Sequence, residues 1–405
     1  MRNNYTFLRL FSVILATLWL QTGTLEAKTR WVGTWATAPQ LVETKNNPPA
    51  PGLTNNSLRQ VVRVSIGGKT LRVKFSNEHS KSPVTLKSAQ IAASKGGSAI
   101  DLKTNKPLTF NGKTDITLAA GAVAYSDPIS FTLTPRMDVA ITLYLGETSS
   151  DITGHPGSRT TSYLLPGNNT AITDFTGAVT TDHWYIINGI DVKASGKTAS
   201  VAIIGNSITD GRGSTTNQQN RWPDILSERL LQNKKTNKIG VLNMGIGGNC
   251  VLAGGLGPTA MVRYERDILN QAGVRWAIVF EGINDIGNLP NNETAATNRS
   301  KTLIDAYKQM IEKAHAKGIT IYGATIMPVK NNGYYGSYRE VCRNTVNEWI
   351  RTSGEFDGVI DFDKAMRNPA DSAKMIDTLQ DDYLHPNVAG HKTMGESVDL
   401  YLFKN

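Results

Sequence analysis

The stretch VAIIGNSITDGRGST, at residues 201–215, decides the fold of the second half of the chain. Its apolar run leads into Gly205 and Ser207, and a short apolar run bounded by glycine is typical of a buried strand. Glycines beside a serine let the backbone turn sharply and leave the hydroxyl exposed, where a nucleophile is useful. A phosphate-binding loop is excluded, because it requires glycine and lysine where Asp210 and Gly211 stand. Taken alone, such a serine is more often a plain turn residue.

Strands and helices alternate through the rest of this half. The predicted strands are 201–204, 239–243, 276–281, 320–324 and 359–362. The predicted helices are 223–231, 260–270, 298–317, 338–352 and 388–402. Apolar strands that alternate with helices predict an α/β fold with a parallel sheet covered on both faces. In such sheets, ligands bind at the carboxyl ends of the strands.

The first half of the chain has a different pattern. Short segments alternate apolar and polar residues and are separated by turn residues, at 61–66, 71–75, 115–118, 129–133 and 138–145. Long helical patterns are absent from this half. We therefore predict a β-sandwich domain, jelly-roll-like, at 28–195, followed by the α/β domain at 196–405.

Residues 1–27 have the pattern of a secretory signal. Arg2 and Arg9 form a positive start, an apolar run of 11 residues follows at 10–20, and a polar stretch ends in Ala27. Because a membrane-spanning helix needs about 20 apolar residues, an uncleaved anchor is the weaker interpretation. We therefore predict export, to the periplasm or the extracellular space, with no stable membrane insertion after signal cleavage.

The composition is that of a globular protein. The chain has 405 residues, of which 40% are hydrophobic and 19% charged, which argues against a disordered or fibrous protein. Its net charge is +9, and residues 28–195 hold 17 basic and 11 acidic residues. This excess suits acidic glycans, although a solvated surface is the simpler interpretation. The basic residues are scattered and form no nucleic-acid-binding motif, so we expect no nucleic-acid partner. Two cysteines, Cys250 and Cys342, leave open whether they pair.

Two further motifs follow the second and third predicted strands. Gly245, Gly247 and Gly248 would begin a dinucleotide-binding fingerprint, but Cys250 stands where its last glycine belongs. The alternative is a loop whose N–H groups point at an anionic centre. Asn284 follows the third strand and could donate a hydrogen bond from its amide, although Gly-x-Asn-Asp alone is an ordinary turn. Both motifs fall at the sheet edge that holds Ser207.

The last motif is Asp382-x-x-His385, just before the final predicted helix. A carboxylate three residues before an imidazole can reach its Nδ1, fix the tautomer and stabilise the imidazolium. A lone histidine is usually structural, and the other histidines lack this spacing, so we assign them no role: His79, His155, His183, His315 and His391. No spacing of cysteines and histidines predicts a metal site.

These four motifs together resemble the SGNH (GDSL) hydrolase family. Ser207, Gly248, Asn284 and the Asp382/His385 pair stand in the order of the family's four sequence blocks, and the resemblance runs from about residue 200 to the C-terminus. It implies a flavodoxin-like parallel sheet flanked by helices.

Two features refine the resemblance. The family's first block usually has aspartate before the serine, whereas this chain has Asn206. The stretches WVGTWAT, at 31–37, and GVRW, at 273–276, resemble exported esterases of the family that carry an N-terminal β domain. Several of those act on acylated plant polysaccharides.

The resemblance implies a serine esterase. Ser207 would be the nucleophile, His385 the general base and Asp382 the residue that orients it. The backbone N–H groups of Ser207 and Gly248 and the Asn284 side chain would form the oxyanion hole. No cofactor and no metal is implied.

The expected substrate is a short acyl ester, acetyl above all, of a small molecule or a polysaccharide. Esters of lipids or aryl alcohols, acyl transfer to a sugar, and a catalytically silent glycan-binding protein stay open as alternatives. Trp31 and Trp35 of the β domain could stack on sugar rings, but we favour core packing for them. The sequence leaves the oligomeric state open.

Overall fold

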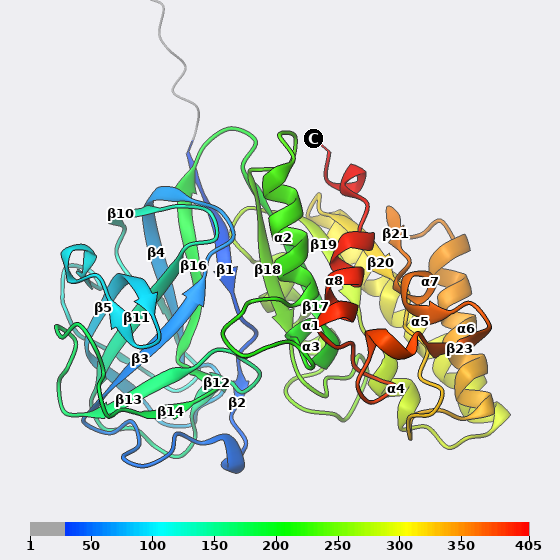
Figure 1. Ribbon diagram of the computed structural model, residues 1–405, viewed down its shortest axis with the longest axis horizontal. Helices are drawn as coiled ribbons and strands as arrows, with labels where there is room; N and C mark the ends of the chain where they lie inside the picture. Colours follow the sequence, from blue (N-terminus) through cyan, green and yellow to red (C-terminus); the bar gives the residue numbers. More distant parts are fainter. Residues whose placement is uncertain (1–28, 405) are drawn as a thin grey trace, which may run out of the picture.

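The computed structural model describes residues 29–404, so the predicted signal at residues 1–27 lies outside the described residues. Figure 1 shows a β-rich region, coloured blue to green, beside an α/β region that runs from green to red. Within residues 29–404, no helix is long and apolar enough to cross a membrane.

The β-rich region is built from antiparallel sheets. The first sheet holds β1 (Arg30–Ala36), β16 (Ile187–Ala194), β4 (Gly68–Ser76) and β10 (Ile129–Leu133) in that order, with β9 (Val123–Tyr125) beside β4. The second holds β14 (Val179–Thr181), β13 (Ser162–Pro166), β3 (Asn56–Arg63), β11 (Asp138–Leu145), β5 (Val84–Gly96) and β6 (Ala99–Ile100), with β7 (Lys106–Leu108) and β8 (Ile116–Leu118) beside β5. A small third sheet holds β15 (Trp184–Tyr185), β12 (Thr153–His155) and β2 (Gln40–Leu41). The 3₁₀ turns η1 (Thr44–Asn46) and η2 (Leu102–Thr104) lie between strands.

The first two sheets share one hydrophobic core. Val73 and Ile190 of the first sheet and Leu58 and Ile141 of the second are fully buried in the same cluster. The predicted antiparallel β-rich region is therefore present, whereas a jelly-roll strand order stays a prediction. Trp35 belongs to this core, in line with the packing role favoured for it.

The α/β region is built on a parallel sheet with the order β18-β17-β19-β20-β21. Its strands are β17 (Ala199–Gly205), β18 (Ile239–Gly245), β19 (Val274–Phe280), β20 (Thr320–Ala324) and β21 (Gly358–Ile360). Its helices are α1 (Ser207–Asp210), α2 (Trp222–Gln232), α3 (Ala260–Tyr264), α4 (Ile283–Gly287), α5 (Glu293–Ala316), α6 (Ser337–Thr352), α7 (Phe362–Met366) and α8 (Val388–Ser397). Smaller elements are η3 (Glu265–Leu269), η4 (Asp377–Leu379), η5 (Leu400–Phe403) and the hairpin β22 (Arg367–Asn368) and β23 (Asp371–Met375).

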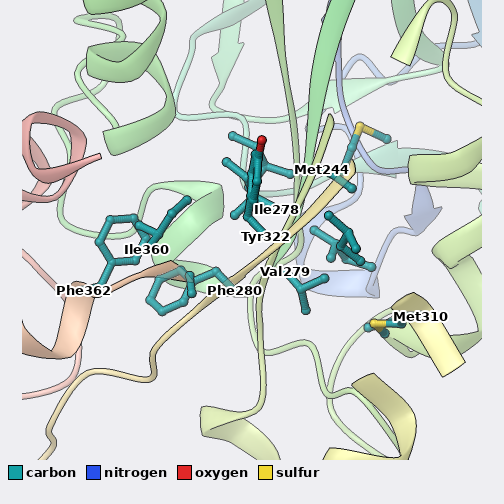
Figure 2. Packing of buried hydrophobic residues seen from close by; sticks show 14 of the residues in the cluster. Met244, Ile278, Val279, Phe280, Met310, Tyr322, Ile360 and Phe362 are labelled. Carbon is teal, nitrogen blue, oxygen red and sulfur yellow. The ribbon is translucent and has the colours of Figure 1, made fainter. Parts of the chain in front are cut away.

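Both faces of this sheet are covered. Every residue of β17 is buried, and so are the last five residues of β19, so side chains on both faces pack against helices. Figure 2 shows this core around Ile278, Val279 and Phe280. The Phe280 ring lies 4.9 Å from that of Phe362, and the Trp222 ring packs edge-on against both.

Several predicted boundaries were wrong for local reasons. The strand predicted at 61–66 ends at Arg63, because Ser65 and Ile66 leave the sheet and donate to Thr34 of β1. The strand predicted at 359–362 ends at Ile360, because the Asp361 side chain accepts from the Lys364 amide and begins α7.

Two predicted helices also end differently in the structure. The helix predicted at 260–270 continues beyond Tyr264 as the π-helical turn η3. The helix predicted at 388–402 ends at Ser397, because Val398 is extended and Asp399 caps the separate turn η5.

The two regions meet along β18, the edge strand of the parallel sheet. A side chain at Gly240 would lie 2.3 Å from the Gly33 carbonyl of β1, so the backbones approach too closely for any larger residue. The Val241 amide donates to Ser65 Oγ at 3.0 Å, which satisfies a group that an open edge would expose. Arg136 also pairs with Asp224 of α2 at 3.0 Å. The β-rich region therefore covers one edge of the parallel sheet.

Candidate active site

Ser207 is the first residue of α1, directly after β17. Asn206 caps this short helix, because its Oδ1 accepts from the Ile208 amide at 3.1 Å. A side chain at Gly205 would lie 2.2 Å from Thr209 Oγ1, so only glycine lets the chain turn this tightly. Ser207 itself is neither buried nor fully exposed, and its hydroxyl stands at the carboxyl edge of the sheet.

The three residues Ser207, His385 and Asp382 are joined by hydrogen bonds. Ser207 Oγ lies 2.9 Å from His385 Nε2, and His385 Nδ1 lies 2.7 Å from Asp382 Oδ2. The carboxylate also accepts from the backbone amides of Leu384 and His385, at 3.0 and 2.7 Å. A carboxylate can only accept here, so Nδ1 carries the proton and Nε2 presents its lone pair to the serine hydroxyl.

The charges of this pair follow from its surroundings. Burial lowers the pKa of His385 below its ordinary value, the Asp382 carboxylate acts to raise it, and the charges of Arg212 and Arg159 lower it further. Burial acts to raise the pKa of Asp382, but the hydrogen bonds from His385 outweigh it and lower that pKa. His385 is therefore neutral and Asp382 ionised near neutral pH, as a general base and its orienting carboxylate require.

Gly248 lies on the loop that follows β18. Its φ of +70° is in the left-handed region, which glycine adopts at little cost. The Leu256 amide donates to the Gly248 carbonyl at 3.0 Å, so the loop folds back over this glycine. Within residues 29–404, the Gly248 N–H has no assigned acceptor, and it is available to an anionic centre.

Asn284 lies in α4, and hydrogen bonds to both its amide nitrogen and its amide oxygen fix the orientation of the side chain. Its Nδ2 donates to the Asn249 carbonyl at 2.7 Å, beside Gly248, and its Oδ1 accepts from the Tyr334 hydroxyl at 3.1 Å. An amide nitrogen carries two hydrogens, so one remains for a ligand. The structure thus brings Asn284 against the Gly248 loop, as the sequence predicted. Sequence reasoning missed Tyr334, which stands 50 residues from Asn284 and belongs to no motif.

The residue after Asn284 holds the same loop. The Asp285 carboxylate accepts from the amides of Val251 and Leu252, at 2.8 and 3.0 Å. Burial raises its pKa, and these two hydrogen bonds act against that rise. The aspartate of Gly-x-Asn-Asp therefore holds the glycine loop in place, a role that the sequence did not reveal.

Asn206 stands where the family usually has aspartate, and its contact with Glu281 explains the difference. Its Nδ2 donates to Glu281 Oε2 at 3.0 Å, and both side chains are buried. Burial raises the pKa of Glu281 to about 8, although Arg263 lies 3.8 Å away and acts to lower it. An aspartate at position 206 would place a second carboxylate against Glu281, whereas an asparagine supplies a donor.

The β-rich region reaches the site through His155, which the sequence analysis left without a role. His155 Nε2 lies 2.8 Å from the Asp210 carboxylate at the end of α1, and Nδ1 lies 2.9 Å from the Ala38 carbonyl. Both ring nitrogens of His155 therefore lie within hydrogen-bond distance of an oxygen atom. Position 210 is three residues from Ser207, so this contact joins the helix that begins with Ser207 to the other half of the chain.

The two cysteines of the chain do not form a disulfide. Cys250 and Cys342 are free and buried, and burial raises the pKa of each thiol, to about 12 and about 11. Within residues 29–404, no group of three or more histidine, cysteine, aspartate or glutamate side chains could hold a metal ion.

The second half of the chain matches a known protein family. Residues 203–393 match the model of the GDSL-like lipase/acylhydrolase family. No curated protein matches the chain.

Among solved structures, a lipolytic protein of the G-D-S-L family from Desulfitobacterium hafniense is 22% identical, with 49% of this chain and 97% of that chain covered and a TM-score of 0.37. A GDSL-like lipase from Bacteroides thetaiotaomicron is 16% identical, with 51% and 89% covered and a TM-score of 0.39. An acetyl-xylooligosaccharide esterase variant from Geobacillus is 20% identical, with 51% and 94% covered and a TM-score of 0.39.

The family match spans all four motifs, from the strand before Ser207 to the helix after His385. Residues 203–393 of this chain therefore form a GDSL-like lipase/acylhydrolase domain.

Proposed function

We propose that this protein is an exported serine esterase that removes short acyl groups, acetyl above all, from carbohydrates. The observation that carries the proposal is the unbroken chain of hydrogen bonds from Ser207 through His385 to Asp382, at 2.9 and 2.7 Å. In this proposal Ser207 is the nucleophile, His385 the general base and Asp382 the residue that fixes its tautomer.

The first half of the reaction forms an acyl-enzyme. Ser207 Oγ attacks the ester carbonyl while its proton passes to His385 Nε2. The negative charge that develops on the carbonyl oxygen is held by the N–H groups of Ser207 and Gly248 and by the second amide hydrogen of Asn284. The bond between the acyl carbon and the alcohol oxygen then breaks, and that oxygen takes the proton from Nε2.

The second half releases the acid. A water molecule gives a proton to Nε2 as its oxygen attacks the acyl carbon, and the bond to Ser207 Oγ breaks. The serine oxygen recovers the proton, and the carboxylic acid leaves. Every proton in this scheme passes through one nitrogen, whose lone pair is directed at the serine because Asp382 holds the opposite N–H.

Two observations support a short acyl group. A side chain at Gly248 would lie only 3.2 Å from Leu256, so little space remains beside the proposed oxyanion donor. Leu256 is 45% exposed, and a long acyl chain would have to displace it. We expect Leu256→Ala to increase hydrolysis of longer esters relative to acetate.

Two observations support a carbohydrate outside the cell. Residues 1–27 have the pattern of an export signal. Ser207 and His385 are both partly exposed, so the ester of a large sugar chain can reach them.

The test is hydrolysis of p-nitrophenyl acetate, butyrate and octanoate by the chain without residues 1–27, beside Ser207→Ala. We expect acetate to be the best substrate and the mutant to lose at least about 10³-fold in kcat. Preference for octanoate would move the proposal to lipid esters. Equal, negligible rates for both proteins on these esters and on acetylated xylan would contradict esterase function and favour a glycan-binding protein.

A further inference from the structure

Two arginines from opposite halves of the chain lie near His385. Arg212 follows α1, and Arg159 follows β12 of the β-rich region. Neither belongs to the four motifs, and the proposed mechanism uses neither of them. Both guanidinium groups lie close enough to His385 for their charges to lower its pKa, after burial and against the opposite effect of Asp382.

The backbone of Arg212 is fixed between the nucleophile and the general base. Its amide donates to the Ser207 carbonyl at 2.8 Å, and its own carbonyl lies 3.0 Å from His391 Nε2. A side chain at the next residue, Gly213, would lie 2.0 Å from the Pro386 carbonyl, so this segment touches the residue after His385. The Arg212 side chain itself is exposed.

The backbone of Arg159 is fixed on the same loop from the other side. Its carbonyl accepts from the Asn217 amide at 2.9 Å, and Thr160 Oγ1 accepts from Gln219 at 2.8 Å. Arg159 has a φ of +50°, a left-handed conformation that is uncommon for a residue with a side chain. The fold thus holds this arginine in an unfavourable conformation next to the site.

Neither guanidinium is neutralised. Within residues 29–404, no carboxylate forms an ion pair with Arg159 or Arg212, although most other buried or half-buried arginines of this protein have one. The Nε of Arg159 is moreover shielded from solvent and has no hydrogen-bond partner among the described residues. A shielded donor without a partner is costly, and a bound ligand would remove that cost.

We propose that Arg159 and Arg212 form a subsite for a carboxylate on the alcohol part of the substrate, so that the preferred ester is an acylated glycan that contains uronic acid. This inference rests on the proposed esterase function and names its substrate class. Guanidinium groups bind carboxylates through paired N–H donors, which suits this role.

The position of the arginines decides which part of the substrate is charged. The leaving alcohol takes its proton from His385 Nε2, so the groups that flank His385 face the alcohol and not the acyl group. In the proposed mechanism, Gly248 on the loop after β18 and Asn284 in α4 hold the carbonyl oxygen instead. A bound carboxylate would also offset the two positive charges that otherwise disfavour the imidazolium of His385.

The test compares two substrates that differ only in charge: acetylated oligogalacturonate and the same oligosaccharide after reduction of its carboxyl groups. Acetate release is measured with the wild type, with Arg159→Gln, Arg212→Gln and the double variant, and with Arg30→Gln as the control. Arg30 bonds to Thr198 at the start of β17, at the opposite end of the sheet. p-Nitrophenyl acetate hydrolysis by the wild type, absent in Ser207→Ala, tests the proposed function separately.

We expect the wild type to prefer the acidic substrate about tenfold or more in kcat/KM, as one charged hydrogen bond predicts. The preference should fall toward one in the double variant and persist in Arg30→Gln. Equal kcat/KM for both substrates, or a preference that survives in a folded double variant, would overturn the subsite while leaving the esterase intact. Should the double variant not fold, the wild type decides: the preference must fall as NaCl rises from about 0.02 to about 0.5 M, and a preference independent of salt would overturn the proposal.

Discussion

At the scale of single residues, Asn206 replaces the usual aspartate of its motif, and the residue that accounts for it lies in another part of the chain. Its amide donates to the buried Glu281 carboxyl at 3.0 Å, and its Oδ1 caps α1 at the same time. Aspartate could cap the helix equally well, but it could donate to Glu281 only when protonated. The asparagine is therefore explained by Glu281, 75 residues away.

Asn206→Asp should destabilise the protein, and more so as the pH rises. Burial raises the pKa of Glu281 to about 8, so at low pH one of the two carboxyls keeps a proton and donates it to the other. At high pH both must ionise in a buried site, and we expect a loss on the order of 3 kcal/mol. Urea unfolding at pH 5 and pH 9 measures the difference. The double variant Asn206→Asp/Glu281→Gln should recover most of it, and an equal loss at both pH values would contradict the account.

Tyr334 is a positioning residue for Asn284, because its hydroxyl donates to the amide oxygen at 3.1 Å. Tyr334→Phe should lower kcat for p-nitrophenyl acetate several-fold, less than the ~10²–10³ expected for Asn284→Ala, with KM little changed. Tyr335→Phe is the matched control, since no hydrogen bond to its hydroxyl is seen within residues 29–404. A fall in kcat of the same size for both tyrosines would assign the effect to packing.

At the scale of elements, α8 is joined to α2 and to the loop after Ser207 by one histidine. His391 Nδ1 accepts from the Trp222 amide at 3.3 Å, and Nε2 donates to the Arg212 carbonyl at 3.0 Å. These partners require the neutral ring with its proton on Nε2. Burial lowers the pKa of His391 to about 4, chiefly because a charged ring would lose its solvation there.

His391→Gln should therefore cost less stability in acid than at neutral pH. The pKa of His391 is about 4 in the folded state and 6.5 when solvated, so the unfolded chain takes up a proton as the pH falls through 6.5. The wild type loses this stabilisation toward pH 4, and the variant has none to lose. We expect the difference in unfolding free energy to shrink by about 2–3 kcal/mol between pH 7.5 and pH 4.5.

Urea titrations at both pH values check this expectation. His315→Gln is the control, because that side chain is 46% exposed. A difference between wild type and His391→Gln that stays constant with pH would show that the ring is not held neutral.

At the scale of the whole molecule, the β-rich region is part of the framework that supports the candidate site. β1 closes the edge of the parallel sheet at β18, and His155 holds the end of α1. Ala36, the last residue of β1, and Ala38 belong to the core of the α/β region, although they lie in the first part of the chain, far from that region in sequence. We therefore expect the two regions to unfold together.

Gly240→Ala tests this coupling. A methyl group there would lie 2.3 Å from the Gly33 carbonyl, so β1 and β18 must separate, at a cost of about 1–3 kcal/mol. Gly189→Ala is the control, because its nearest contact would be an ordinary 3.4 Å. Thermal unfolding should show one transition, lowered in Gly240→Ala only. Two separate transitions, or equal effects of the two substitutions, would show that the regions are independent.

The sequence predicted the parallel sheet better than the β-rich region. Strands β17 to β20 are short apolar runs, and such runs can be recognised as buried strands from the sequence alone. The sequence analysis did not predict β1, β5 or β16. The inner residues of β1 are buried on both faces, because β18 covers the face that would otherwise meet solvent. The sequence of β1 therefore lacks the alternation of apolar and polar residues that marks a half-buried strand. That burial depends on a strand about 200 residues away.

The same limit applies to the site. Ser207 and the Asp382/His385 pair have local signals, a glycine-flanked turn and a spacing of three residues, and the structure places them in hydrogen-bond contact. Tyr334, His155 and Glu281 act through contacts between residues 50 to 75 positions apart. No periodicity or spacing records such contacts, so only the folded chain reveals them.

The central claim is that Ser207 is a nucleophile activated by His385, and covalent labelling tests it most directly. The wild type, Ser207→Ala and His385→Ala are treated with a fluorophosphonate, and the modified peptide is identified by mass spectrometry. We predict one label, on Ser207, that forms rapidly in the wild type, slowly in His385→Ala and not in Ser207→Ala. A label on another residue, or ester hydrolysis that continues in a wild type fully labelled at Ser207, would contradict the account.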